Sequence, residues 1–393
     1  MAREIVVLSG VRTAIGEYGA SFKDTPATAL GAAVIKEAVA RAKVDPASVG
    51  HCVMGNIIHG EPRDMYISRV AALDAGLPTS IPCLTVNRMC GSGLQAIVTA
   101  SQYILLGDTD TAVAGGAESM SRAAYMLQTL RWGQRMGDAT AIDAMVGALH
   151  DPFGNGHMGI TAENVAAKYG ITREEQDAFA LESHQRAANA LEKGYFTSQI
   201  VPFELKSKKG PVQFTTDEHV RKNAKIEDMQ RLRPAFKKDG TVTAGNASGV
   251  NDAAAAVVLM EAGAAAKAGA KPIARLVAYG HAGVPPEIMG VGPVPAVKRV
   301  LEKAGLKLQD MDVIEANEAF AAQALAVARD LEFDPKKTNP NGGAVALGHP
   351  IGATGAIVTV KALYELQRIN GKYALVTMCI GGGQGIAAIF ERV

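Results

Sequence analysis

The chain has 393 residues, enough for roughly two or three domains of ordinary size. Hydrophobic residues make up 48% and charged residues 20%, a composition that is typical of a soluble globular protein and excludes intrinsic disorder. Four cysteines are too few for a disulfide scaffold, and 40 Lys and Arg against 39 Asp and Glu exclude the strong basic field of a nucleic-acid-binding protein.

No apolar stretch approaches the roughly 18 residues that a membrane-spanning helix needs. The first residues also lack the basic start and the long apolar run of a secretory signal. We therefore expect a cytoplasmic protein that has neither a membrane nor a nucleic acid as its partner.

Short apolar runs alternate with amphipathic segments along the chain. We predict buried strands at residues 5–8, 53–55, 111–115, 257–260, 273–278, 313–316, 374–378 and 387–390. We predict helices at residues 27–42, 94–106, 295–304 and 356–368. Strands that alternate with helices indicate a layered α/β fold with mostly buried sheets.

Parts of the sequence recur at a nearly constant distance. The block AIVT occurs at residues 96–99 and again at 356–359, which is 260 residues later. Asn56 follows the strand at 53–55 much as Asn317 follows the strand at 313–316. The order and spacing predict a duplicated α/β unit, although any two α/β halves share a strand, glycine and helix pattern.

The middle of the chain, residues 121–246, has fewer strand-like runs and more charge. Within it, residues 206–238 carry ten basic side chains and only four acidic ones. The basic residues are Lys206, Lys208, Lys209, Arg221, Lys222, Lys225, Arg231, Arg233, Lys237 and Lys238. A basic segment in an otherwise near-neutral chain indicates a site for a polyanionic small molecule, and a solvated charged face is the alternative.

Cys90 is a candidate nucleophile. It lies between a strand-like run and the sequence Gly-Ser-Gly, which opens an amphipathic helix. The N–H groups and the dipole at a helix N-terminus favour the thiolate, and flanking glycines let a substrate approach the backbone. Cys52 and Cys83 lack this setting, and we interpret them as small hydrophobic packing residues.

Cys379 ends the strand at 374–378 and precedes three successive glycines, of which Gly381 is the first. Three glycines in a row indicate that bare backbone is needed there. An oxyanion hole made from main-chain N–H groups is one such need, and a tight turn is the alternative.

Two further polar residues lie at places where α/β folds carry chemistry. His349, held between Gly348 and Pro350, is a candidate general base, although a lone loop histidine is usually unremarkable. Asn317 follows a buried strand, where it would either support an oxyanion or cap the next helix. No cysteine or histidine spacing matches a zinc site, so we expect no metal.

Taken in order, these motifs resemble those of the thiolases, the acetyl-CoA C-acyltransferases. The matching segments are 86–93 (VNRMCGSG), 317–320 (NEAF), 348–350 (GHP) and 379–383 (CIGGG). The resemblance covers nearly the whole chain. Within the family, the chain looks most like the bacterial biosynthetic β-ketothiolases of the polyhydroxyalkanoate-forming type, including those of broad chain-length range. Residues 157–159 and 244–249 point the same way.

The resemblance implies a five-layer αβαβα thiolase fold built from two related halves. The N-terminal half would comprise residues 1–120 and 247–270, and the C-terminal half residues 271–393. Residues 121–246 would form a loop domain that covers the active site and binds coenzyme A. The resemblance also suggests a homotetramer made of two tight dimers, joined through the loop at 121–143.

The implied reaction is a reversible Claisen condensation of two acyl-CoA molecules to a 3-ketoacyl-CoA and CoA, by a ping-pong mechanism. Cys90 would become acylated, His349 would activate it, and Cys379 would move the proton at the α-carbon of the second acyl-CoA. The usual pKa of a thiol, about 8.5, would be tuned toward neutral pH for this role. One oxyanion hole would comprise His349 and a water held by Asn317, and the other the N–H groups of Cys90 and Gly381.

The substrates implied are acetyl-CoA, other acyl-CoA thioesters and CoA itself, with no separate cofactor. Seven residues fall where the family contacts coenzyme A or its acyl chain. They are Leu149, His157, Met158, Arg221, Ser248, Ala319 and Phe320.

Three alternatives remain open from the sequence. A degradative 3-ketoacyl-CoA thiolase of fatty-acid β-oxidation would carry the same motifs. A thiol redox protein would use Cys90 and Cys379 as a reversible disulfide, but would not call for His349 or Asn317. A non-catalytic acyl-CoA-binding protein is favoured by the basic segment alone.

Overall fold

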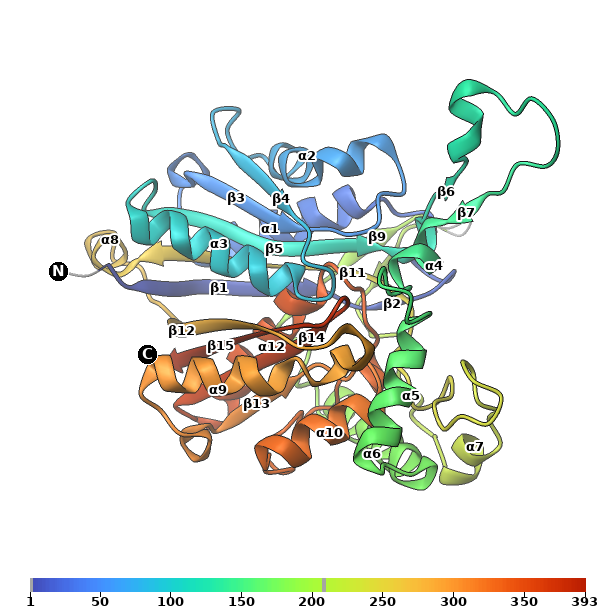
Figure 1. Ribbon diagram of the computed structural model, residues 1–393. Helices are drawn as coiled ribbons and strands as arrows, with labels where there is room; N and C mark the ends of the chain where they lie inside the picture. Colours follow the sequence, from blue (N-terminus) through green and yellow to red (C-terminus); the bar gives the residue numbers. More distant parts are fainter. Residues whose placement is uncertain (1–2, 207–209) are drawn as a thin grey trace.

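The computed structural model describes residues 3–206 and 210–393. It is a layered α/β molecule from which one long loop projects (Figure 1). Of the basic segment found in the sequence, Lys208 and Lys209 lie outside the described residues.

The N-terminal strands pair in the order β4–β3–β5–β11–β1. β3 runs parallel to β4 and β5, whereas β11 runs antiparallel to β5 and β1. Their bounds are β1 (Ile5–Thr13), β3 (His51–Gly55), β4 (Cys83–Val86), β5 (Thr111–Ser119) and β11 (Asn251–Glu261). Every residue of β1 and β5 is buried, which explains why these strands are nearly continuous apolar runs in the sequence.

The C-terminal strands repeat this arrangement. They are β12 (Ala274–Gly283), β13 (Val313–Ala316), β14 (Tyr373–Ile380) and β15 (Gln384–Arg392). The order β13–β14–β15–β12 and its parallel, antiparallel, antiparallel pairing match β3–β5–β11–β1. The repeat predicted from the sequence is therefore confirmed, and the two halves join where β1 pairs with β12.

Helices form the other layers. α3 (Ser92–Leu106) and α12 (Thr354–Ile369) contact each other and strands of both halves, so they make the central layer. α1 (Ala27–Ala42) and α2 (Ile67–Asp74) lie on the outer side of the N-terminal half. α9 (Pro293–Ala304) and α10 (Ala321–Leu331) lie on the outer side of the C-terminal half (Figure 1). The fold is thus the expected thiolase-like stack of helix and sheet layers.

The middle of the chain is more helical than the sequence suggested. Its helices are α4 (Ala144–Ala148), α5 (Met158–Tyr169), α6 (Arg173–Glu192) and α7 (Ile226–Gln230). Its short strands are β6 (Tyr125–Met126), β7 (Ile142–Asp143), β8 (Ile200–Val201), β9 (Phe203–Leu205) and β10 (Val212–Phe214). A capping box between Thr172 and Glu175 explains why α6 begins where it does.

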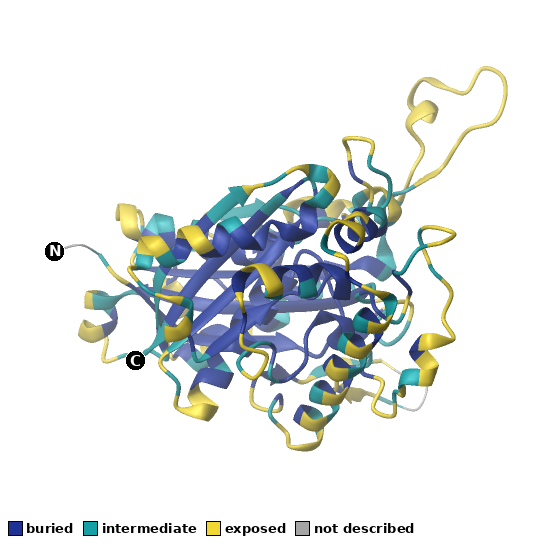
Figure 2. Ribbon diagram, turned by 60° about the horizontal axis from the view of Figure 1, so that its bottom comes forward, coloured by how far each residue is buried: buried dark blue, intermediate teal, exposed yellow. Residues whose placement is uncertain are grey.

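The remaining elements are short. They are β2 (Gly16–Glu17), α8 (Ala262–Lys267), α11 (Ala344–Leu347) and the 3₁₀ turns η1 (Pro46–Ser48), η2 (Pro62–Tyr66), η3 (Met120–Arg122), η4 (Gln128–Trp132), η5 (Pro286–Val291) and η6 (Leu308–Asp310). The buried residues fill the centre of the molecule, between and along the strands (Figure 2). In the part of the chain that the structure describes, no helix has both the length and the apolar character of a membrane span.

Candidate active site

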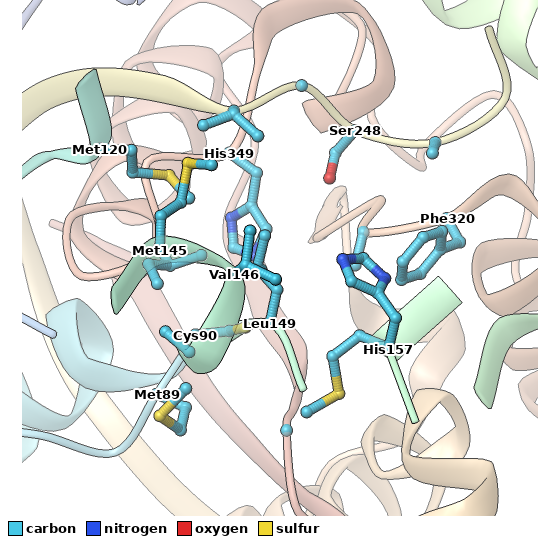
Figure 3. Close-up of a pocket in the computed structure, with 18 of the residues that line it drawn as sticks. Met89, Cys90, Met120, Met145, Val146, Leu149, His157, Ser248, Phe320 and His349 are labelled. Atoms are coloured by element: carbon cyan, nitrogen blue, oxygen red, sulfur yellow. The ribbon is translucent and has the colours of Figure 1, made fainter. Parts of the chain in front are cut away.

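A cavity of about 290 Å³ lies where the two halves meet the middle segment. Its lining includes Cys90, His349 and Gly381 (Figure 3). Six of the seven residues predicted to contact coenzyme A also line it, and these are Leu149, His157, Met158, Ser248, Ala319 and Phe320. Residues far apart in the sequence therefore converge on one mostly apolar pocket.

A short turn fixes the position of Cys90. Asn87 Oδ1 accepts a hydrogen bond from the N–H of Met89 at 3.0 Å, and Ser92 Oγ donates to the carbonyl of Met89 at 2.7 Å. Met89 has a φ of 43°, the left-handed region that a non-glycine residue rarely adopts. Cys90 follows directly, one residue before the Gly91 cap of α3, so the predicted location at a helix N-terminus is confirmed.

The expected thiolate is not favoured at rest. Burial raises the pKa of Cys90 to about 11, although the N–H of Gly381 and its own N–H both stabilise the charged sulfur. The backbone N–H groups favour the thiolate as predicted, but desolvation outweighs them, so the thiol is the resting form. The nucleophile must lose its proton to a partner during the reaction.

His349 is able to accept that proton. Burial lowers its pKa to about 4, so the imidazole is neutral near pH 7. Nδ1 lies 2.7 Å from Thr354 Oγ1, and the main-chain N–H donates to Asn251 Oδ1 at 3.0 Å. A ring held at Nδ1 leaves Nε2 as the nitrogen that can accept a proton, and Figure 3 shows the ring directed into the pocket near Cys90.

Asn317 lies behind His349, not at a helix cap. Its side chain is buried, with Nδ2 at 3.5 Å from His349 Nε2. α10 begins at Ala321 with Phe320 as its cap, so the interpretation of Asn317 as the cap is wrong. The amide is therefore available to the histidine and to groups around it.

Cys379 lies at the end of β14 and is completely buried. Burial and the nearby charge of Cys90 both raise its pKa well above the usual range. The prediction that this thiol is tuned toward neutral pH is therefore wrong for the pocket without substrate. Both cysteines are free thiols.

The sequence suggested two roles for the three glycines that follow Cys379, a tight turn and an oxyanion hole, and different glycines fit the two roles. Gly382 and Gly383 have φ values of 83° and 87° and turn the chain from β14 into β15. Gly381 is not left-handed, and its N–H points at the Cys90 sulfur. A β-carbon at Gly381 would lie 2.9 Å from Met158 Cε, so the backbone is closely packed there.

Other predicted contact residues shape one wall of the pocket. His157 caps α5 by accepting the N–H of Gly159 at Nδ1, so its neutral ring carries the proton on Nε2. The ring stacks on Phe236 with centroids 4.7 Å apart. Ser248 lies beside Phe320, and its hydroxyl points into the pocket (Figure 3).

Arg221 lies outside this pocket. It lines a second cavity of about 540 Å³ together with His184, His219 and Lys222, and its guanidinium pairs with Glu17. The segment 244–249 contributes Gly245 to this cavity and Ser248 to the first, so the same segment lines both cavities. None of the described basic side chains of segment 206–238 lines the first pocket, although Phe236 of that segment does.

The two remaining cysteines lie opposite each other on neighbouring strands. Cys52 is buried, which confirms it as a packing residue. Cys83 is partly buried and packs against the same core, which confirms it as a packing residue too, and contact with Cys52 and with Arg69 lowers its pKa to about 7.

Sequence reasoning missed several residues of the site. Met89, Met120, Met145 and Met289 line the pocket, and nothing in the sequence distinguishes them from core methionines. Glu118 is buried near Cys90 and accepts hydrogen bonds from Asn56 Nδ2 and the N–H groups of residues 57, 58 and 352. The repeat held a signal for it, because Asn56 and Glu118 occupy in the first half the places of Asn317 and Cys379 in the second.

Comparisons with known proteins agree with this geometry. Residues 5–263 match the thiolase N-terminal domain and residues 270–392 the thiolase C-terminal domain. The chain is 65% identical over 394 residues to beta-ketothiolase BktB of Cupriavidus necator, covering 100% of both proteins.

Two solved structures are also similar to this chain over nearly their whole length. The acetyl-CoA acetyltransferase of Bacillus anthracis superposes with a TM-score of 0.98 at 45% identity, covering 100% of this chain and 99% of that one. Human mitochondrial 3-ketoacyl-CoA thiolase in complex with CoA superposes with a TM-score of 0.96 at 45% identity, covering 100% of this chain and 98% of that one.

Proposed function

The chain belongs to the thiolase family, and on that premise we propose that it is an acetyl-CoA C-acetyltransferase, a β-ketothiolase. It would join two acyl-CoA molecules reversibly into a 3-ketoacyl-CoA and free CoA. One observation carries the proposal: a thiol, a neutral imidazole and a backbone N–H directed at the thiol share one apolar pocket.

In the first half-reaction, His349 Nε2 takes the proton of Cys90 as the sulfur attacks the thioester carbonyl of acetyl-CoA. The N–H groups of Cys90 and Gly381 hold the developing oxyanion. The carbon–sulfur bond to CoA breaks, and the leaving sulfur takes a proton from Cys379. Acetyl-Cys90, a Cys379 thiolate and a protonated His349 remain.

In the second half-reaction, the Cys379 thiolate removes a proton from the α-carbon of a second acetyl-CoA. His349 Nε2–H and a water held by Asn317 stabilise the enolate oxygen. The enolate carbon attacks the acetyl carbonyl, the bond to Cys90 breaks, and the Cys90 sulfur recovers its proton from His349. Both thiols and the neutral imidazole are thereby restored.

Acylation also prepares Cys379 for this step. The charged form of Cys90 is one of the two causes that raise the pKa of Cys379. Acetyl-Cys90 cannot ionise, so no charge at Cys90 opposes the Cys379 thiolate that the first half-reaction leaves. We propose that Cys379 becomes the base only in the acyl-enzyme.

We propose that the second cavity receives the phosphate end of coenzyme A. Arg221 and Lys222 supply positive charge there, and the segment 244–249 lines both this cavity and the acyl pocket. Since the chemistry uses thiols, an imidazole and N–H groups, we propose no separate cofactor. Full activity after dialysis against EDTA is expected, and activity restored only by a metal would contradict this.

Intact-protein mass spectrometry after mixing with acetyl-CoA tests the assignment, followed by peptide mapping. One acetyl group is expected on the peptide that contains Cys90. Cys83→Ser is the matched control and should still be labelled, whereas Cys90→Ser should not. A folded protein that binds CoA without forming an adduct would overturn the proposal.

A second candidate is a degradative 3-ketoacyl-CoA thiolase acting on longer chains. The volume of about 290 Å³ and the methionine lining favour it, because such a pocket has room for more than an acetyl group. Thiolysis rates measured over a series of 3-ketoacyl-CoA chain lengths separate the two. A rate that rises with chain length supports the degradative role.

We also propose a homotetramer made of two dimers. The loop between β6 and β7 projects from the body of the molecule (Figures 1 and 2). In this loop Trp132 is 91% exposed and Met136 is 88% exposed. Leu130 and the neighbouring Tyr125 of β6 are exposed as well. Such apolar exposure is typical of an interface. Light scattering should give four subunits, and Trp132→Ser should favour dimers; a single-subunit mass for the parent protein would contradict the proposal.

A further inference from the structure

A small cavity of about 10 Å³ lies next to the active-site histidine, lined by Gly348, and shares no lining residue with the substrate pocket. Its lining includes Glu315, Asn317, Thr354 and Lys361. Glu315 ends β13, and Lys361 lies on the central helix α12. Most of the other lining residues are apolar, so these four polar side chains meet in an otherwise apolar part of the core.

Hydrogen-bonding capacity around this cavity is incomplete. Within the described residues, Glu315 Oε1 and Asn317 Oδ1 are buried and have no partner. Lys361 Nζ donates to Glu315 Oε2 at 2.8 Å and to the carbonyl of Gly342 at 2.6 Å. An ammonium group has three N–H bonds, so one donor remains. Two acceptors and one donor thus surround a space of about one water.

We propose that this cavity is the binding site of a single structural water. The water accepts a hydrogen bond from Lys361 and donates one to Glu315 Oε1 and one to Asn317 Oδ1. Three hydrogen bonds are the usual number for a buried water. This water lies on the Oδ1 side of Asn317 and is distinct from the one proposed for the oxyanion hole.

Because the water donates to Oδ1, it fixes which end of the Asn317 amide faces His349. The donor group Nδ2 then points toward His349 Nε2. A flipped amide would turn its oxygen to Nε2 and would favour a proton there, which would remove the base. Glu315 and Lys361 are therefore positioning residues for His349, a role that rests on the proposed function.

The other acids near the pair do not compete for the water. Glu318 accepts from Ser183 Oγ, Asn339 Nδ2 and the N–H of Val345. Glu365 accepts from Asn341 Nδ2 and from Arg368. Neither residue lines the cavity.

A crystal structure of the full-length protein at about 1.5 Å or better tests the site directly. A water within hydrogen-bonding distance of Glu315, Asn317 and Lys361 is expected. An empty cavity would overturn the proposal whatever the enzyme does.

A second experiment tests what the pair does for the reaction. Both residues are replaced together, Glu315→Leu with Lys361→Met, so that no buried charge is left without its partner. The rate of Cys90 acetylation by acetyl-CoA should fall at least about tenfold. KM should change little, because the substrate pocket is untouched.

Glu365→Gln is the matched control, on the same helix but outside the cavity, and should acetylate like the parent. An unchanged rate in the folded double variant would overturn the role of the pair. A parent protein that fails to acetylate Cys90 would instead overturn the proposed function. If the double variant does not fold, the crystallographic water still decides the proposal.

Discussion

The Thr354 hydroxyl lies 2.7 Å from His349 Nδ1 and 2.9 Å from the carbonyl oxygen of Pro350. A carbonyl only accepts, so the hydroxyl gives its hydrogen to Pro350 and accepts the Nδ1–H of the histidine. The proton of the neutral ring is thereby held on Nδ1. This leaves Nε2 with a lone pair toward the pocket, which is what a base for Cys90 requires.

Thr354→Val removes this acceptor without changing the size of the side chain much. The buried Nδ1–H would then be unpaired, at about 1–3 kcal/mol, or the proton would move to Nε2. The rate of Cys90 acetylation should fall about tenfold. Thr354→Ser keeps the hydroxyl and should lose far less, and equal losses in both variants would show that the methyl packing matters instead.

Cys379→Ser should separate the two half-reactions. A serine hydroxyl is a much weaker acid than a thiol, so it cannot become the base that removes the α-proton. Acetylation of Cys90 by acetyl-CoA should remain detectable, whereas condensation should be lost by at least about a hundredfold. Complete loss of acetylation in the folded variant would mean that the roles of the two cysteines are misassigned.

Alkylation of Cys90 should depend steeply on pH. Since burial raises its pKa to about 11, the reactive thiolate is a small fraction at neutral pH and grows with pH. The iodoacetamide rate at Cys90 should rise about tenfold per pH unit between about 7 and 10. Peptide mapping in a Cys83→Ser background checks this, and a plateau below about pH 9 would contradict the raised pKa.

Arg221→Ala should weaken CoA binding more than it slows turnover. Loss of a cation at the second cavity should raise KM for CoA several-fold while kcat changes little. Arg231→Ala removes a cation from the same segment outside that cavity and is the control. If kcat alone collapsed, the phosphate-binding assignment of the basic segment would be wrong.

Glu118→Gln should destabilise the protein. The two carboxylate oxygens accept four N–H groups from the two halves, and an amide would turn its own N–H groups against two of them. The free energy of unfolding should fall by about 2–4 kcal/mol. Glu37→Gln, in the exposed pair with Arg41, should change it by less than about 1 kcal/mol. Thermal denaturation of both variants compares them, and equal shifts would contradict a structural role for Glu118.

The sequence predicted the order of elements well because the sheets are buried on both faces. β1 begins with a run of four apolar residues, and most of β11 is a run of alanine, valine, leucine and methionine. The predicted end of β1, at residue 8, is too early. The strand continues to Thr13 through polar residues that the sheet itself buries. The helices of the middle segment escaped notice because α6 is largely polar and charged.

The sequence by itself determined the duplicated architecture and the ordered motifs around Cys90, Asn317, His349 and Cys379. These features depend on local periodicity and residue spacing, which one chain displays directly. Only the tertiary structure decided the protonation of these groups. Desolvation depends on atoms brought from distant segments, and it overrode the helix terminus that favoured a thiolate at Cys90. The same long-range packing buried Glu118 and the Glu315–Lys361 pair, whose hydrogen bonds join segments that are far apart in the sequence.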